Sequence, residues 1–237
     1  MKKATSILLT LMMGFSVVVG QTPEIEIKNV LQQYKTFVSI NAAIHYYMYT
    51  SHSSTKVTEE GVGIYQKQGD KLRVQQYGTE FIQNDKYTLV KDDSSKAIVL
   101  TNVQKDQNTT FNVEKILSAY EKIEVIPSKK SGQKAFQIYF KQGASSEYEK
   151  AKIYFNEKTN ILDEIVLYYG KAYDLSLDPK IRNYQKPKLR MVYTKFDTNP
   201  VFAKETFDVS KYVNLNSKGK NTLKTKYSSY KFYDQTQ

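Results

Sequence analysis

The sequence contains no cysteine among its 237 residues. Thiol catalysis and cysteine-ligated metal sites are therefore excluded. The chain cannot form disulfides, even in a compartment that permits them, and it cannot carry a lipid on an amino-terminal cysteine as a lipoprotein does. It must fold on its hydrophobic core alone, and its length suffices for one domain.

Histidine is nearly absent as well, because only His45 and His52 are present. They lie seven positions apart on a strand that turns between them, so we expect structural histidines and no metal site. Two carboxylate pairs fall in predicted turns, where neighbouring side chains point apart: Glu59-Glu60 and Asp92-Asp93. We therefore predict that the protein is not an enzyme and that it has no catalytic residue and no cofactor. A hydrolase of an envelope polymer stays open only if distant strands bring two carboxylates together.

The first twenty residues have the pattern of a secretory signal peptide. Lys2 and Lys3 precede an apolar stretch over residues 7–19. Its length of about 13 residues is short of the about 20 that span a bilayer. We predict residues 1–20 as a signal peptide cleaved after Gly20, and a mature protein in the periplasm; an uncleaved anchor is the alternative.

Positive charge dominates, with a formal net charge of +11, and it concentrates near the C-terminus. Residues 211–237 hold six lysines and one acid. An exported protein rarely meets nucleic acid, so anionic lipid headgroups or an acidic envelope protein are the better partners. We predict residues 214–237 as a basic tail that binds them; the alternative is a terminal strand along the sheet edge. The expected contact residues are Lys218, Lys220, Lys224, Lys226, Tyr227, Tyr230 and Lys231.

The mature chain is predicted to begin with a short helix. Thr22 is a suitable N-cap and Pro23 suits the first helical position. Apolar residues then recur at helical spacing, which predicts one buried stripe: Ile27, Val30, Leu31 and Tyr34.

A change to period two at residue 38 predicts a long strand, and short strands separated by turns predict an antiparallel meander. A second helix is expected over residues 113–122 and a long loop over residues 170–188. The fold class is α+β, mostly β, as a single domain over residues 21–213.

This order of elements resembles the periplasmic lipoprotein-carrier family, the LolA/LolB-like half-barrel. The sequence Glu60-Gly61-Val62-Gly63-Ile64-Tyr65-Gln66-Lys67 looks like the family's second-strand pattern, and residues 81–89 are similar to its next hairpin. Thr206-Phe207-Asp208-Val209 resembles its closing strand. The family's Arg-Pro after the strand-two lysine is replaced here by Gln68-Gly69, which puts its latch mechanism in doubt.

The resemblance implies an antiparallel curved half-barrel sheet with helices covering its concave face, and an apolar cavity for the acyl chains of a lipid or lipoprotein. The expected cavity-lining residues are Val38, Ile40, Ile44, Tyr46, Met48, Val62, Ile64, Leu72, Val74 and Leu89. We expect a monomeric carrier or chaperone that touches the membrane peripherally. The alternative is a structural or interaction subunit of a cell-envelope assembly, with the half-barrel as scaffold and the tail as docking arm.

Overall fold

The computed structural model describes residues 22–103, 119–128, 130–141, 147–176, 180, 182–216 and 219–236. The predicted signal peptide, most of the predicted second helix and Lys218 lie outside these residues. Within the part of the chain that the structure describes, no helix is long and apolar enough to cross a bilayer.

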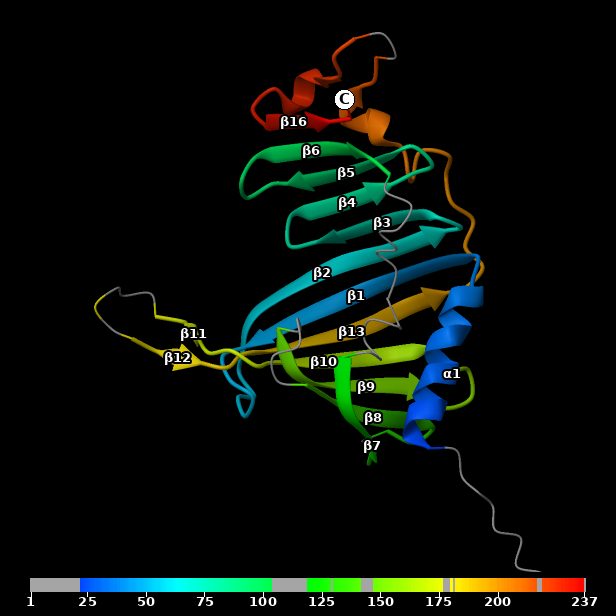
Figure 1. Cartoon of the computed structure of the whole chain (residues 1–237), viewed down its shortest axis with the longest axis vertical. Helices are drawn as coiled ribbons and strands as arrows, with labels where there is room; N and C mark the ends of the chain where they lie inside the picture. Colours follow the sequence, from blue (N-terminus) through cyan, green and yellow to red (C-terminus); the bar gives the residue numbers. More distant parts are fainter. Residues whose placement is uncertain are drawn as a thin grey trace, which may run out of the picture.

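Twelve strands of the described residues form one large, curved and open sheet, as predicted (Figure 1). Its order is β16-β6-β5-β4-β3-β2-β1-β13-β10-β9-β8-β7. Neighbours are antiparallel except β16, which pairs parallel with β6. The central strands are β1 (Ser39–Tyr49), β2 (Val57–Gln68) and β13 (Lys188–Asp197).

The remaining strands continue on either side of this centre. One side holds β3 (Lys71–Gln76), β4 (Thr79–Gln83), β5 (Tyr87–Asp92), β6 (Ala97–Asn102) and β16 (Lys231–Gln235). The other holds β7 (Tyr120–Ile126), β8 (Gln133–Phe140), β9 (Tyr148–Asn156) and β10 (Leu162–Tyr169). Two predictions need correction here. Residues 120–122 belong to β7 and not to a helix, and the predicted loop over residues 170–188 contains a small hairpin of β11 (Tyr173–Asp174) and β12 (Tyr184–Gln185).

The helix α1 (Pro23–Thr36) begins where the sequence predicts, with the Thr22 hydroxyl accepting a hydrogen bond from the Ile25 amide. Its apolar stripe docks on the β7–β10 side of the sheet (Figure 1). There Ile27, Val30 and Leu31 pack with residues such as Phe136 and Phe155. The sheet has two faces. We call the face that α1 covers the helix face, and the opposite face the back face.

A second hydrophobic core lies on the back face, at the other end of the sheet. Ile82, Leu89, Ile98 and Leu100 from β4–β6 are covered there by the C-terminal segment, defined as residues 209–236. This segment contains short helical turns, Val209–Lys211 (η1) and Thr225–Tyr227 (η2), the small pair β14 (Val213–Asn214) and β15 (Thr222–Leu223), and β16. One sheet therefore carries two cores on opposite faces.

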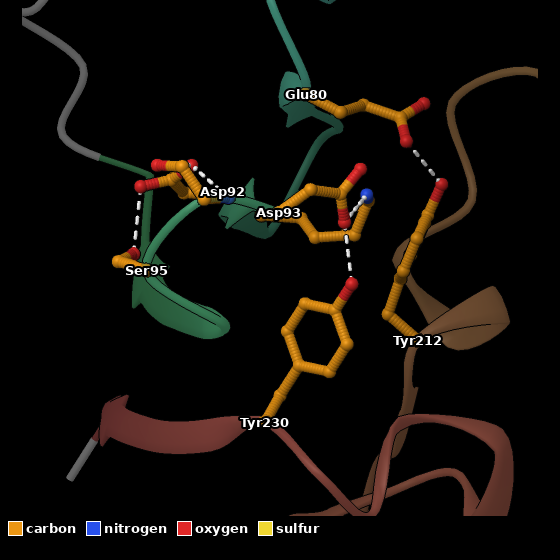
Figure 2. Close-up of polar contacts among 8 residues, drawn as sticks. Glu80, Asp92, Asp93, Ser95, Tyr212 and Tyr230 are labelled. Atoms are coloured by element: carbon orange, nitrogen blue, oxygen red, sulfur yellow. Dashed lines mark hydrogen bonds and ion pairs between the residues drawn. The ribbon is translucent and has the colours of Figure 1, made fainter.

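Polar contacts fasten the C-terminal segment to the sheet (Figure 2). The Tyr212 hydroxyl donates to the Glu80 carboxylate at 2.5 Å, and the Tyr230 hydroxyl donates to Asp93. Glu80 is only 5% exposed and also accepts from Arg73 Nε at 2.8 Å. The segment predicted as a tail thus includes a terminal strand at the sheet edge, the alternative that its sequence left open.

Candidate functional site

A row of mostly apolar side chains crosses the helix face on the side away from α1. Tyr65 of β2 lies opposite Val74, Val74 opposite Phe81, Phe81 opposite Val90, and Val90 opposite Val99. Tyr233 of β16 continues the row beside Val99. Because directly paired residues point to the same side of a sheet, these six side chains form one continuous band, which we call the apolar ladder.

The apolar ladder is accessible, unlike the two cores. The side chains of Tyr65, Val74, Phe81, Val90 and Val99 are half-buried, and Tyr233 is 49% exposed. At about 4.8 Å between neighbouring strands, five steps make a band about 24 Å long. An exposed apolar band of this kind is typical of a surface that binds an apolar ligand.

Two glycines of β2 make room for aromatic rings on the helix face beside the ladder. Gly63 lies opposite Ile44 and Gly61 opposite Tyr46 in the register of β1 and β2. A Cβ added at Gly63 would lie 2.4 Å from the Gln75 carbonyl oxygen and 2.7 Å from the Tyr46 ring. A Cβ at Gly61 would meet the Tyr77 ring at 3.3 Å. The Gly-x-Gly spacing therefore serves close packing.

Four tyrosines lie close together on the helix face, from Tyr34 of α1 to Tyr65 of the apolar ladder. Burial raises the pKa of Tyr46 and of Tyr65 to about 12, with the neighbouring Tyr77 adding to the shift at Tyr46. Burial also raises the pKa of Tyr193 and Tyr34 well above the ordinary value. These phenols stay neutral at every physiological pH, so they add no charge to this part of the helix face.

The structure divides the predicted cavity-lining residues between the two faces. Ile40, Ile44, Tyr46, Met48, Leu72 and Val74 lie on the helix face, as the strand pairing shows. Val62 and Ile64 pair with His45 and Ala43 and so point to the back face, away from the helix face. Leu89 also points to the back face, where it is fully buried in the core. Val38 precedes β1 and is 72% exposed.

Of the ladder residues in β2–β6, those that the sequence did not single out are Tyr65, Phe81, Val90 and Val99. Their strands are apolar on both sides, so alternation alone does not say which side faces the helix. The one available signal is the glycine pair: Gly61 and Gly63 share a face with Tyr65, opposite the more apolar Val62 and Ile64.

Predicted contact residues of the C-terminal segment have two different environments. Tyr227 and Tyr230 pack against the back-face core, and the Tyr227 ring stacks on Tyr212 at 5.1 Å between centroids. Lys220, Lys226 and Lys231 are exposed, and Lys224 is half-buried. The lysines are thus displayed on a segment whose tyrosines belong to the core.

His52 and the Asp92-Asp93 pair have structural contacts in this fold. His52 Nε2 lies 3.2 Å from the Tyr169 carbonyl oxygen, and Nδ1 lies 3.4 Å from Glu149. Hydrogen bonds from the Ser95 and Ser94 hydroxyls lower the pKa of Asp92 to about 2, so this carboxylate holds its turn together. Asp93 accepts from Lys91 and Tyr230. Among the described residues, no cluster of three or more His, Asp or Glu side chains is arranged to hold a metal ion.

No family model matches the chain, and no curated protein matches it in sequence. Solved structures do match in fold. An uncharacterized conserved protein from Thermus thermophilus is 9% identical with a TM-score of 0.45, covering 77% of this chain and 92% of its own. The lipoprotein LppX of Mycobacterium tuberculosis is 13% identical with a TM-score of 0.43, covering 76% and 97%.

The matches include the LolA superfamily. Its protein from Nitrosomonas europaea is 9% identical, with a TM-score of 0.31, and the match covers 78% of this chain and 98% of that one.

Proposed function

We propose that the protein is an exported, non-enzymatic carrier or chaperone that binds an acyl chain of a lipid or lipoprotein along the apolar ladder. The observation that carries this proposal is the ladder itself, a continuous band over six neighbouring strands on the face that α1 shares. In this proposal, the signal peptide is cleaved after Gly20 and the mature protein works in the periplasm. It contacts membranes only at their surface.

The dimensions and chemistry of the ladder suit such a ligand. One leaflet of a bilayer is about 15 Å of hydrocarbon, so a band of about 24 Å accommodates one chain lying across the strands. Each methylene removed from water contributes about 0.8 kcal/mol. The apolar side chains of the ladder offer no charge that would need to be desolvated.

The apolar ladder is tested with an environment-sensitive fatty-acid probe and a matched pair of variants. Val90→Asn places a polar amide in the middle of the ladder, and we expect probe binding to weaken about tenfold because the amide loses its hydration. Val62→Asn makes the same change on the back face, where the side chain is 63% exposed, and should leave binding unchanged.

The measurement is probe fluorescence at equilibrium, together with native mass spectrometry of protein purified from envelope extracts. Absence of both probe uptake and a bound acyl species in the unaltered protein would refute the carrier. Equal weakening by the two variants would place any binding elsewhere than on the ladder.

The alternative of an envelope-assembly subunit is favoured by the exposed lysines of the C-terminal segment. Its test cannot use a deletion of residues 214–237, because Tyr227 and Tyr230 pack against the back-face core. Replacing Lys220 and Lys231 by glutamine changes exposed charge and leaves the contact of Lys226 with the Tyr227 ring in place. Loss of co-purifying envelope proteins from this variant would support docking through the segment.

A further inference from the structure

The back face carries a second pattern, at the opposite end of the sheet from the C-terminal segment. Tyrosine and lysine alternate across five neighbouring strands: Tyr139, Lys150, Tyr168, Lys188 and Tyr49. A neighbouring row adds Lys152 and Arg190 on either side of Val166. Because each strand supplies one member, the alternation exists only in the folded sheet.

The aromatic rings hold the cations of these rows in place. Lys188 Nζ lies 4.7 Å from the centre of the Tyr49 ring, and Lys150 Nζ lies 4.8 Å from that of Tyr168. The Arg190 guanidinium lies 5.5 Å from the Tyr47 ring. A ring attracts a cation through its quadrupole and carries no net negative charge, so the positive potential of these groups survives the contact.

A pocket of about 440 Å³ opens among these side chains. Its charged lining residues are four bases and one acid: Lys130, Lys152, Lys188, Arg190 and Glu164. The Glu164 carboxylate accepts from Arg190 Nη2 at 2.7 Å and is itself only 17% exposed. The volume lies within the range of small-ligand sites, which runs from about 300 to 1,000 Å³.

Neutral donors complete the pocket. Burial raises the pKa of Tyr154 and of Tyr168, so both phenols keep their protons. Gln133 adds an amide to the lining. Ammonium, guanidinium and phenol groups in one pocket supply charged and neutral donors, which is the chemistry that a multi-oxygen anion such as phosphate requires.

We propose that this back-face pocket binds the phosphoryl group of a phosphate ester, either a soluble one or an anionic phospholipid headgroup. The site lies on the opposite face from the apolar ladder and does not depend on it. Lys152 and Lys188 supply positive charge at the pocket, and Arg190 stays oriented by Glu164.

The test uses Lys152→Gln/Lys188→Gln, which leaves the Arg190–Glu164 ion pair intact. Calorimetry with glycerol 3-phosphate and flotation with phosphatidylglycerol vesicles distinguish the two sources. Binding to glycerol 3-phosphate supports a soluble ester, and binding to phosphatidylglycerol vesicles alone supports a headgroup. In either case the double variant should bind about tenfold more weakly, because charge-assisted hydrogen bonds are lost. Added salt should weaken binding of the unaltered protein.

The matched control is Lys158→Gln/Lys211→Gln, which removes the same charge at exposed residues outside the pocket. It should bind like the unaltered protein, and circular dichroism should show that all three proteins are folded. The proposal is overturned if neither probe binds, if phosphatidylcholine vesicles bind equally well, or if the two double variants lose binding to the same extent.

Discussion

Gly63 illustrates how one missing side chain determines the packing of a neighbouring strand. The Tyr46 ring and the Gln75 carbonyl occupy the space that a Cβ would need. We expect Gly63→Ala to lower the free energy of unfolding by about 1–3 kcal/mol, because backbone and ring must both shift. Gly61→Ala should cost less, since its nearest neighbour is the Tyr77 ring at 3.3 Å. Urea unfolding of both variants checks this order, and equal losses would contradict it.

The buried tyrosines of the helix face predict a loss of stability at alkaline pH. Burial raises the folded-state pKa of Tyr65 from 10.0 to about 12. The neutral phenol therefore stabilises the fold fully below pH 10, and this contribution is lost as the pH rises from 10 to about 12. Tyr65→Phe removes the ionisation, so its urea midpoint should fall less than that of the unaltered protein over this interval. Tyr184→Phe, at a residue that is 61% exposed, should follow the unaltered protein. Parallel curves for Tyr65→Phe and the unaltered protein would contradict the prediction.

Among the elements, the C-terminal segment is attached to the sheet by the back-face core, by the pairing of β16 with β6 and by a few polar contacts. Removing the Tyr212 hydroxyl deprives the buried Glu80 carboxylate of one of its two donors. We expect Tyr212→Phe to lower the free energy of unfolding by about 1–3 kcal/mol. The amides of β6 and β16 should also exchange faster with solvent. Tyr233→Phe, at an exposed position of β16, is the control and should change neither quantity. Unchanged exchange in Tyr212→Phe would show that the apolar contacts alone hold the segment.

The helix α1 and the strand β1 are the elements whose sequence predicts most of their structure. Thr22, Pro23 and the stripe of Ile27, Val30 and Leu31 encode the helix locally, and all have the predicted place. In β1 the alternation from Ile40 to Tyr46 matches the buried positions. Helix caps and apolar periodicity can be recognised in the sequence because they act within one element and do not depend on which other element packs against it.

At the scale of the whole molecule, face assignment could not be read from the sequence. Leu89 has an apolar neighbourhood on either side, and its burial is decided by Val209 and Val213, more than 100 residues later. The orientation of Val62 depends on the register of β1 and β2 and not on its own hydrophobicity. The back-face pocket is even harder to predict than the face assignment, because its lysines and tyrosines become neighbours only through the pairing of five strands. The presence of a curved, mostly antiparallel sheet was predictable; which residues face which side was not.

The pairing of β16 with β6 means that part of the sheet can form only late in folding. The sheet receives its edge at β6 only when Lys231–Gln235 arrives, and β1 receives its second neighbour only with Lys188–Asp197. Contacts so distant along the chain close slowly, because loop entropy must be lost before they form. A nascent chain that lacks its last fifty residues therefore has a central strand paired on one edge only and an uncovered back-face core. The back-face core and the pairing of β1 on both edges are therefore completed only by the end of the chain.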